Sequence, residues 1–314
     1  MPETAPEIIF HHYPPSPVSE KVRAGFGLKG LSWRSVEQNR LPERPELFAM
    51  TGGYRRIPVM QIGADIYCDT QCILHELEAR FPEPSFFPNN GAGLPFAISR
   101  WTDGPVFDLA FRVALAPVAG DLPPAFVADR ARLYIGADAD MEKERADLPH
   151  TLAQLRAQIG WLEARLETGR PYILGDVPGM PDLLAWYIVW FINERYAEAK
   201  SFFEEFPKLN AWAERMAAIG HGSTAPMTPA EALEIGKEST AITPEALDEG
   251  DPQGLKPGMT VTVAPLTDSG EKAIEGRLLA SSRDRVAIVN QDPACGETVV
   301  HFPRVGYRVT IVDA

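Results

Sequence analysis

The first eighty residues alternate short apolar runs with stretches of helical periodicity. Residues 8–10 and 33–36 favour strands, because they are rich in β-branched and aromatic side chains. Ser16-Pro17 predicts a helix start, since serine suits the N-cap and proline suits the first helical position. Apolar residues then recur at helical spacing up to Gly30, which suits a left-handed cap.

Residues 55–70 are the stretch around which this region is organised. β-Branched residues on both sides of Gly63-Ala64 predict a hairpin. Pro58 fits the first residue of an edge strand, where a cis bond would leave the Ile57 backbone able to pair with an extended peptide. Asp69-Thr70 then opens a helix over 70–81, and its free N–H groups attract an anion. Taken locally, an ordinary hairpin and a capped helix explain the same pattern.

From residue 96 to 220, helical periodicity replaces the strand pattern. The stretch 96–119 is apolar and aromatic, but Gly104-Pro105 interrupts it and predicts a broken or kinked helix. Further helices are predicted over 126–136, 148–168, 181–194 and 207–219.

The last ninety or so residues change character twice. Residues 223–254 are polar and acidic, and they read as a surface linker with short helices after Thr228-Pro229 and Thr243-Pro244. Five alternating, β-branched stretches then suggest a small barrel or curled sheet that docks on the rest of the protein, because about sixty residues are marginal alone. These stretches are 259–264, 274–280, 285–290, 297–302 and 307–312.

The pattern therefore predicts a multidomain α+β protein. Its parts are an α/β domain over residues 1–82, an all-helical domain over 83–222, a linker over 223–254 and a small β-barrel-like domain over 255–314.

Composition narrows the class of protein. A net charge of −13 argues against a general nucleic-acid or anionic-membrane surface, and no apolar run reaches membrane-spanning length. The three cysteines, without a signal peptide ahead of the first strand, predict a reduced cytoplasmic setting. We expect no metal, because no Cys/His cluster has zinc spacing.

Several separate marks resemble the glutathione transferase family over residues 6 to about 220. The family's first-helix, cis-proline, helix-start, core-helix and closing-helix motifs correspond in order to residues 16–23, 56–59, 69–70, 171–182 and 206–212. The resemblance implies a thioredoxin-like first domain that binds glutathione as co-substrate, and a homodimer.

The resemblance implies that a hydroxyl at the start of the first helix meets the glutathione sulfur. Ser16 is placed for this role and Ser19 is the second choice, while a plain N-cap explains Ser16 as well. Tyr13 offers a third hydroxyl for the sulfur, but it precedes two prolines and is rather expected to line the substrate pocket.

Other residues would hold the rest of the tripeptide. In the family pattern, the Ile57-Pro58 segment pairs with the cysteinyl backbone, Asp69 accepts from the γ-glutamyl ammonium, and Thr70 binds the γ-glutamyl carboxylate. Arg55 or Arg56 could hold the glycyl carboxylate, although surface arginines are usually only solvated.

A hydrophobic electrophile would be the second substrate. Trp101, Phe107, Phe111 and Arg112 could form the wall that receives it, and helix-core packing explains each of them equally well. The family's usual capping serine is replaced at Gly179-Met180-Pro181-Asp182, so the side-chain cap is expected to be lost.

Two alternatives stay open at this point. One is other glutathione-dependent chemistry: isomerisation, dehalogenation or ether cleavage. A cysteine at the sulfur position would favour reductive chemistry, and serine stands there instead. The other is a non-catalytic scaffold that binds a partner through residues 255–314, which lie outside the family pattern.

Overall fold

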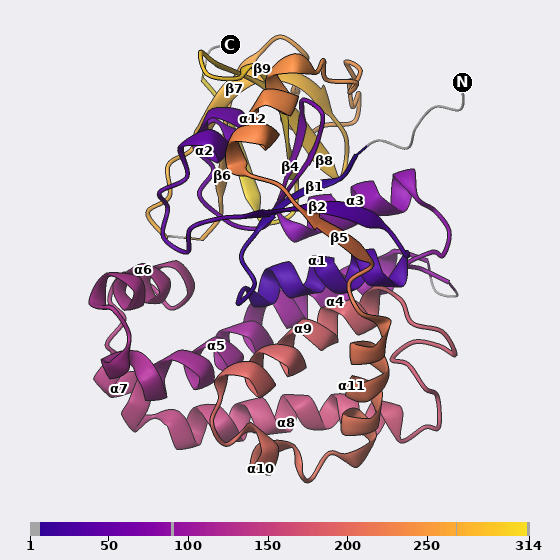
Figure 1. Ribbon diagram of the computed structural model, residues 1–314, viewed down its shortest axis with the longest axis vertical. Helices are drawn as coiled ribbons and strands as arrows, with labels where there is room; N and C mark the ends of the chain where they lie inside the picture. The colour runs from indigo at the N-terminus through magenta and orange to yellow at the C-terminus, as the bar shows by residue number, and fades with distance from the viewer. Residues whose placement is uncertain (1–6, 89–90, 268, 313–314) are drawn as a thin grey trace. The chain divides into compact units, whose positions relative to one another are not determined.

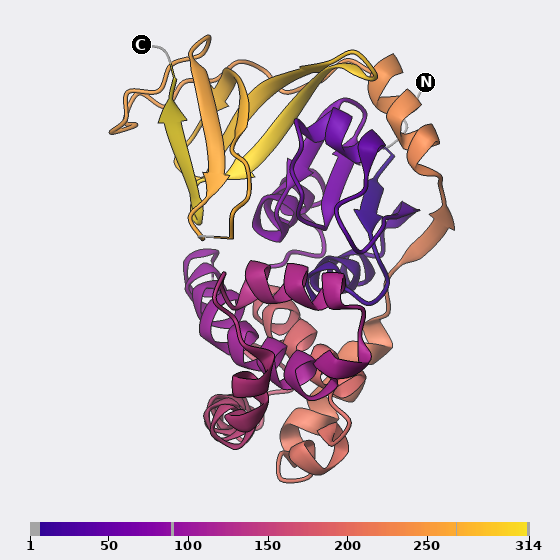
Figure 2. The same cartoon turned by 90° about the vertical axis from the view of Figure 1, so that its left-hand side faces the viewer.

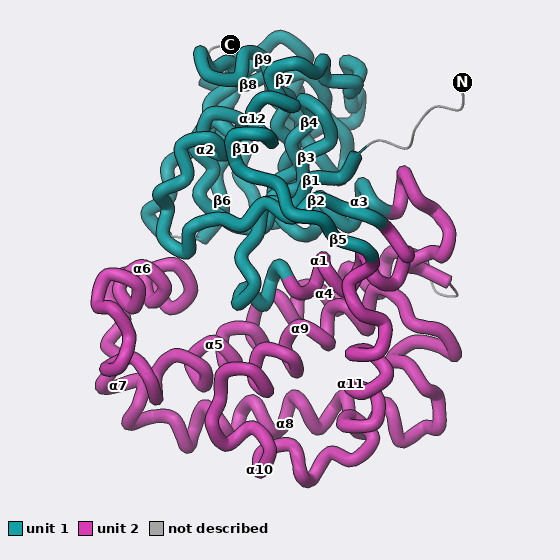
Figure 3. The backbone as a smooth tube through the Cα atoms, viewed as in Figure 1, with its two compact units in different colours: residues 1–19, 32–77, 223–314 teal, residues 20–31, 78–222 magenta. Residues whose placement is uncertain are grey.

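The structure is a computed structural model that describes residues 7–88, 91–267 and 269–312. It divides into two compact units, coloured separately in Figure 3. Unit 1 comprises Met1–Ser19, Ser32–Leu77 and Ser223–Ala314, and unit 2 comprises Glu20–Leu31 and Glu78–Gly222. The residues from 223 onward thus belong to the same compact unit as the N-terminal strands. The sequence-based boundaries at 82, 222 and 254 stay a prediction about domains.

Unit 1 is built on a ten-stranded sheet with the order β10-β6-β7-β8-β9-β4-β3-β1-β2-β5 (Figure 1). The strands are β1 Ile9–His12, β2 Ser32–Glu37, β3 Val59–Ile62, β4 Asp65–Cys68, β5 Ser223–Pro226, β6 Thr260–Pro265, β7 Ile274–Ser281, β8 Arg285–Asp292, β9 Gly296–Pro303 and β10 Tyr307–Ile311.

The N-terminal strands form the predicted α/β arrangement. β1 runs parallel to β2 and antiparallel to β3, and β3 forms a hairpin with β4. The hairpin turns at Gly63, whose φ of 59° lies in the left-handed region that glycine adopts readily. The hairpin predicted from the β-branched pattern is therefore confirmed.

The five predicted C-terminal strands are also confirmed, but they do not form a separate barrel. β9 pairs in parallel with β4, with Asp65 opposite Val299 and Tyr67 opposite His301, so the C-terminal strands continue the central sheet. Figure 2 shows these long strands beside the N-terminal ones. At the other edge β5 pairs in parallel with β2, and part of the predicted linker is thus a strand.

Four helices contribute to unit 1. α2 Pro45–Thr51 and α12 Pro229–Glu238 lie within it, while α1 Pro17–Leu28 and α3 Thr70–Arg80 run across the division between the units. α12 begins where the Thr-Pro signature predicts, with Thr228 Oγ accepting from the amide of Glu231. Residues 243–248 after the second Thr-Pro pair form no helix.

A polar cluster inside the sheet holds α12 in place. Gln61 donates to the carbonyl of Ala232 in α12 at 2.8 Å, and its Oε1 lies 3.0 Å from Nε2 of His11. Gln38 contacts the other ring nitrogen of His11 at 3.2 Å. Burial lowers the pKa of His11 to about 4, so this imidazole is neutral near pH 7 and uses both nitrogens in hydrogen bonds.

One hydrophobic core joins the two ends of the chain within unit 1. It packs residues of α2 and the hairpin, such as Leu47 and Ile66, against C-terminal residues such as Val261, Ile288 and Val300. All five side chains are fully buried. The expectation that the C-terminal strands dock on the body of the protein is confirmed for unit 1.

Unit 2 is all-helical in its described part. Its helices are α4 Gly93–Trp101, the π-helical turn η1 Thr102–Val106, α5 Phe107–Leu115, the 3-10 turn η2 Ala116–Asp121, α6 Pro124–Tyr134, α7 Met141–Ala146, α8 Leu148–Leu166, α9 Met180–Arg195, α10 Ala199–Phe203 and α11 Pro207–Ile219, together with residues 20–28 of α1 and 78–80 of α3. The predicted break between α4 and α5 is present at Gly104, whose φ of −116° and ψ of −107° are not helical.

We predict that Val300→Ala lowers the free energy of unfolding by about 2 kcal/mol, because it removes two carbons from a fully buried site. Val305→Ala is the matched control, since Val305 is 50% exposed. Urea unfolding followed by circular dichroism measures both variants. Equal stabilities of the two would show that the C-terminal strands do not share the core.

Candidate functional site

The sheet of unit 1 brings three predicted site segments to the same end of its central strands. β3 pairs antiparallel with β1 and β4, with Val59 opposite His11 and Cys68. The residues that follow β1, precede β3 and follow β4 therefore emerge at the same end of these strands. These residues include Ser16, Ile57-Pro58 and Asp69-Thr70.

The segment after β1 places two serines at the start of α1. The amide of Ser16 donates to the carbonyl of Tyr13 at 3.0 Å, and Oγ of Ser16 accepts from the amide of Ser19 at 3.2 Å. Ser16 is thus the N-cap that the Ser-Pro pattern predicts. Both serines are fully buried, and Oγ of Ser19 has no hydrogen-bond partner among the described residues.

The segment after β4 forms the start of α3. Asp69 has a φ of 75°, a left-handed conformation that aspartate tolerates better than most residues. Its Oδ1 accepts from the amide of Gln71 at 2.9 Å, which confirms the predicted cap. Thr70 begins the helix and is 9% exposed. The Ile57–Pro58 peptide bond is cis, as predicted.

The C-terminal residues add a feature that sequence reasoning missed. The hydroxyl of Tyr307 donates to Oδ2 of Asp69 at 3.1 Å, and it lies 2.7 Å from the hydroxyl of Tyr54. Burial raises the pKa of both tyrosines, and the Asp69 carboxylate adds to this effect. The two phenols therefore stay protonated as hydrogen-bond donors near neutral pH.

Arg56 also meets C-terminal residues. Its Nε lies 2.8 and 2.9 Å from the two carboxylate oxygens of Glu271, and its Nη2 contacts Glu271 and, at 2.7 Å, Oγ1 of Thr267. Burial opposes ionisation of Glu271, but the contacts with Arg56 and Ser269 outweigh it and lower the pKa of that carboxyl. Arg56 stays a predicted glutathione-binding residue whose partner in this structure is Glu271.

The other predicted pocket residues have packing partners in their own units. Tyr13 belongs to the core of unit 1. In unit 2, Trp101 donates to Gln158 at 2.7 Å, and Arg112 forms ion pairs with Glu144 and Asp108.

Phe107 and Phe111 also lie in unit 2 and are nearly buried. Both rings contact the rings of Tyr134 and Phe191. That these two phenylalanines, Trp101, Arg112 and Tyr13 line a substrate pocket stays a prediction.

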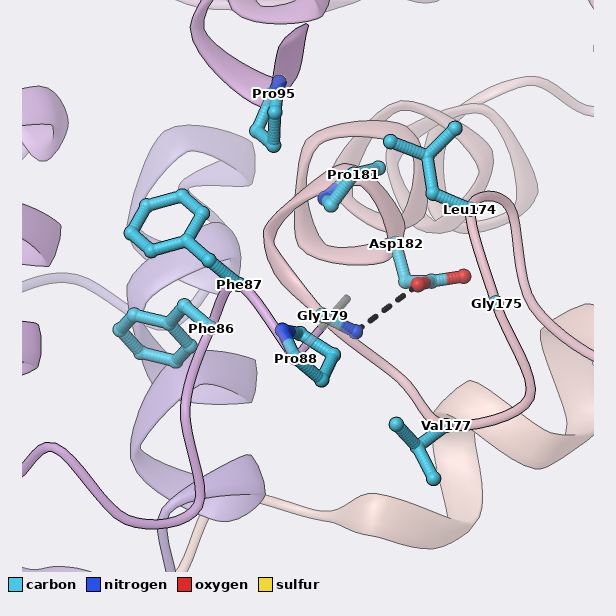
Figure 4. Close-up of a pocket in the computed structure, with 10 residues that line it drawn as sticks. All are labelled: Phe86, Phe87, Pro88, Pro95, Leu174, Gly175, Val177, Gly179, Pro181 and Asp182. Carbon is cyan, nitrogen blue, oxygen red and sulfur yellow. Dashed lines mark hydrogen bonds between the residues drawn. The ribbon is translucent and has the colours of Figure 1, made fainter. Parts of the chain in front are cut away.

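Two hollows that differ in size lie among the described residues of unit 2. One, of about 1020 Å³, is lined by Arg112 together with residues of the α6–α8 region such as Lys143 and His150. The other is a cavity of about 10 Å³ beside the start of α9, drawn in Figure 4, with space for about one water molecule. The small cavity is not a ligand site.

Asp182 explains how α9 begins without a capping serine. Its Oδ2 accepts from the amide of Gly179 at 3.0 Å, the bond dashed in Figure 4. Its Oδ1 accepts from the amide of Ile173 and from Nε1 of Trp212. Gly179 has no side chain that could cap the helix, as we expected. The other bond of a capping box is kept, because Asp182 accepts from the amide of Gly179.

Among the described residues, no group of three His, Cys, Asp or Glu side chains could hold a metal ion. None of the helices described is both long and apolar enough to cross a membrane.

The fold and the site define a class of protein: a thioredoxin-like α/β sheet with a cis-proline hairpin, followed by an all-helical unit and additional C-terminal strands. The family "Glutathione S-transferase, N-terminal domain" matches residues 10–85, and the family "Glutathione S-transferase, C-terminal domain" matches residues 140–215. No curated protein matches the chain.

Solved structures extend this result. A GST-like protein from Pseudomonas syringae is 30% identical, covers 97% of this chain and 99% of its own, and has a TM-score of 0.77. Two more distant structures show the fold alone. A glutathione transferase from Phanerochaete chrysosporium is 19% identical, covers 69% of this chain and 98% of its own, and has a TM-score of 0.56. A glutathione S-transferase from Rhodospirillum rubrum F11 is 18% identical, covers 67% of this chain and 88% of its own, and has a TM-score of 0.51. The chain belongs to the glutathione transferase family and is a glutathione transferase-like enzyme.

Proposed function

We propose that the protein adds or exchanges glutathione at a hydrophobic electrophilic substrate. The observation that carries this proposal is that the Ser16 helix start, the Ile57-Pro58 segment and the Asp69-Thr70 helix start emerge at the same end of the central strands β1, β3 and β4. Family membership supplies glutathione as the co-substrate.

Each of these groups suits one part of the tripeptide. The Ile57 backbone pairs with the cysteinyl residue, as an extended peptide does at a strand edge. Asp69 accepts from the γ-glutamyl ammonium, and the N-terminus of α3 at Thr70 binds the γ-glutamyl carboxylate. Arg56 binds the glycyl carboxylate through its guanidinium group.

Ser16 acts on the sulfur. The thiolate is the reactive form of glutathione, and a hydroxyl donor at a helix N-terminus stabilises it by a hydrogen bond and by the helix dipole. The sulfur electron pair forms a bond to the electrophilic carbon. Either a leaving group departs with its own electron pair, or an addition product takes up a proton. A serine, unlike a cysteine, forms no disulfide with glutathione, which favours transfer over reductive chemistry.

We predict that Ser16→Ala lowers kcat by about 10- to 100-fold while the Kd for glutathione changes less, because the hydroxyl acts mainly on the reacting thiolate. Steady-state kinetics with a general electrophile and calorimetry with glutathione measure the two quantities. Ser19→Ala is the paired variant. If Ser19→Ala loses activity and Ser16→Ala does not, the sulfur contact belongs to Ser19.

We predict that Asp69→Asn weakens glutathione binding by about 1–3 kcal/mol, because the γ-glutamyl ammonium loses its charged partner. Asparagine keeps an oxygen for the Gln71 amide and tolerates the left-handed conformation, so α3 should stay capped. Calorimetry gives the affinity, and a thermal melt checks the fold. An unchanged affinity in a folded variant would remove Asp69 from the site, and no binding by the wild type at millimolar glutathione would refute the proposal.

We further propose a cytoplasmic homodimer, as the family resemblance and the reduced cysteines suggest. Light scattering at micromolar concentration should give about twice the mass of one chain for such a dimer. A monomeric mass would rule the dimer out.

A further inference from the structure

The C-terminal part of unit 1 supplies partners to two side chains of the proposed glutathione site. Glu271 pairs with Arg56, and Tyr307 donates to Asp69. These are the two side chains assigned above to the charged ends of the tripeptide, its glycyl carboxylate and its γ-glutamyl ammonium.

The two contacts come from one end of the C-terminal strands. Tyr307 begins β10 and lies opposite Pro265, the last residue of β6. The amide of Leu266 donates to the carbonyl of Gly306 at 2.9 Å, so the chain after β6 starts beside Tyr307. We call Thr267, Ser269, Glu271 and Tyr307 the C-terminal cluster.

The cluster offers a carboxylate, as the glycyl end of the tripeptide does, and a neutral hydroxyl donor in place of the γ-glutamyl ammonium. The carboxylate of Glu271 stands where a glycyl carboxylate would pair with Arg56, and the hydroxyl of Tyr307 donates to Asp69 as an ammonium would. The Glu271 side chain is 4% exposed and Ser269 is 2% exposed, while the Arg56 side chain is 24% exposed, so the carboxylate is buried and the arginine is partly open to solvent. A second carboxylate cannot take the same edge of the guanidinium group while Glu271 holds it.

We infer that the C-terminal cluster is an internal substitute for glutathione, which occupies Arg56 and Asp69 until the tripeptide displaces it. This inference rests on the proposed function, since glutathione is the ligand that competes. The protein would then bind glutathione more weakly than it would without these contacts. Only the fraction of molecules in which Arg56 and Asp69 are released from the C-terminal cluster could bind the tripeptide. Any partner or condition that moves the C-terminal cluster would raise the affinity.

The direct test is Glu271→Gln, which keeps the size of the side chain and removes its charge. Calorimetry should show glutathione bound about fivefold to tenfold more tightly than by the wild type, the range expected for release of a partly exposed arginine from a charged partner. The gain should require the glycyl carboxylate. Glutathione converted to its glycine amide should therefore bind both proteins alike.

Glu76→Gln is the matched control. Glu76 is also nearly buried within unit 1, and it also forms an ion pair with a partly exposed arginine, Arg285. Its loss should leave glutathione affinity unchanged. If Glu271→Gln does not fold, Tyr307→Phe keeps the ring and removes the donor to Asp69, and it should tighten glutathione binding in the same direction.

A second measurement separates this inference from the proposed function. Phenylglyoxal labels accessible arginines, and mass spectrometry reads the label on Arg56. Arg56 should react several times faster in Glu271→Gln than in the wild type, and Glu76→Gln should not change it. Unchanged labelling overturns the inference. If labelling rises but neither protein binds glutathione, Glu271 does cover Arg56, while the proposed function and the competition with glutathione are both wrong. If the wild type binds glutathione and Glu271→Gln binds it equally or more weakly, the inference is overturned and the proposed function stands.

Discussion

The parallel pairing of β4 with β9 is the contact on which the rest of unit 1 depends. Without it β4 would be an edge strand with a row of unpaired backbone groups. With it, the strands β4-β3-β1-β2-β5 and the strands β10-β6-β7-β8-β9 form one ten-stranded sheet. The ring of His301 stacks on that of Tyr67 with 4.4 Å between centroids, and its Nε2 lies 3.0 Å from the buried carboxylate of Asp65. Thr243 and the amide of Ile242 bind the same carboxylate.

This pairing also connects the C-terminal strands to the proposed site. β4 leads directly into Asp69 and Thr70, so the strand that anchors the C-terminal residues also positions the start of α3. The core is shared for the same reason: Val300 of β9 pairs with Ile66 of β4, and both face residues from α2 and from the C-terminal strands. The C-terminal strands are therefore part of the folded unit that carries the proposed site.

Local sequence signals were enough for most elements. β-Branched alternation located β6 to β10, Ser-Pro and Thr-Pro pairs located α1 and α12, and Gly104-Pro105 located the break between α4 and α5. Such signals act within a few residues of chain and need no knowledge of neighbours. β5 was not predicted, because its four residues are all exposed and show no alternation of apolar and polar side chains. Only its pairing with β2 makes it a strand.

No local sequence signal predicts the pairings between distant segments. Nothing in the residues around Asp65 or Val299 specifies that β4 pairs with β9, because backbone hydrogen bonds are the same for every sequence. The contacts of Arg56 with Glu271 and of Asp69 with Tyr307 join residues more than two hundred positions apart. Pattern reasoning predicted the helix start at Asp69 and the strand at Tyr307, but it gave neither residue a distant partner.

A family motif identifies which groups can bind a ligand. It does not tell which of these groups already contact another side chain of the same protein. In this chain an extension outside the family pattern reaches the motif through the sheet, because β4, which pairs with β9, ends at Asp69 and Thr70 of the proposed glutathione site. Any extension that pairs with this strand would lie beside the same residues. The C-terminal residues that pair with β4 are therefore placed next to the start of α3, where the proposed glutathione site lies.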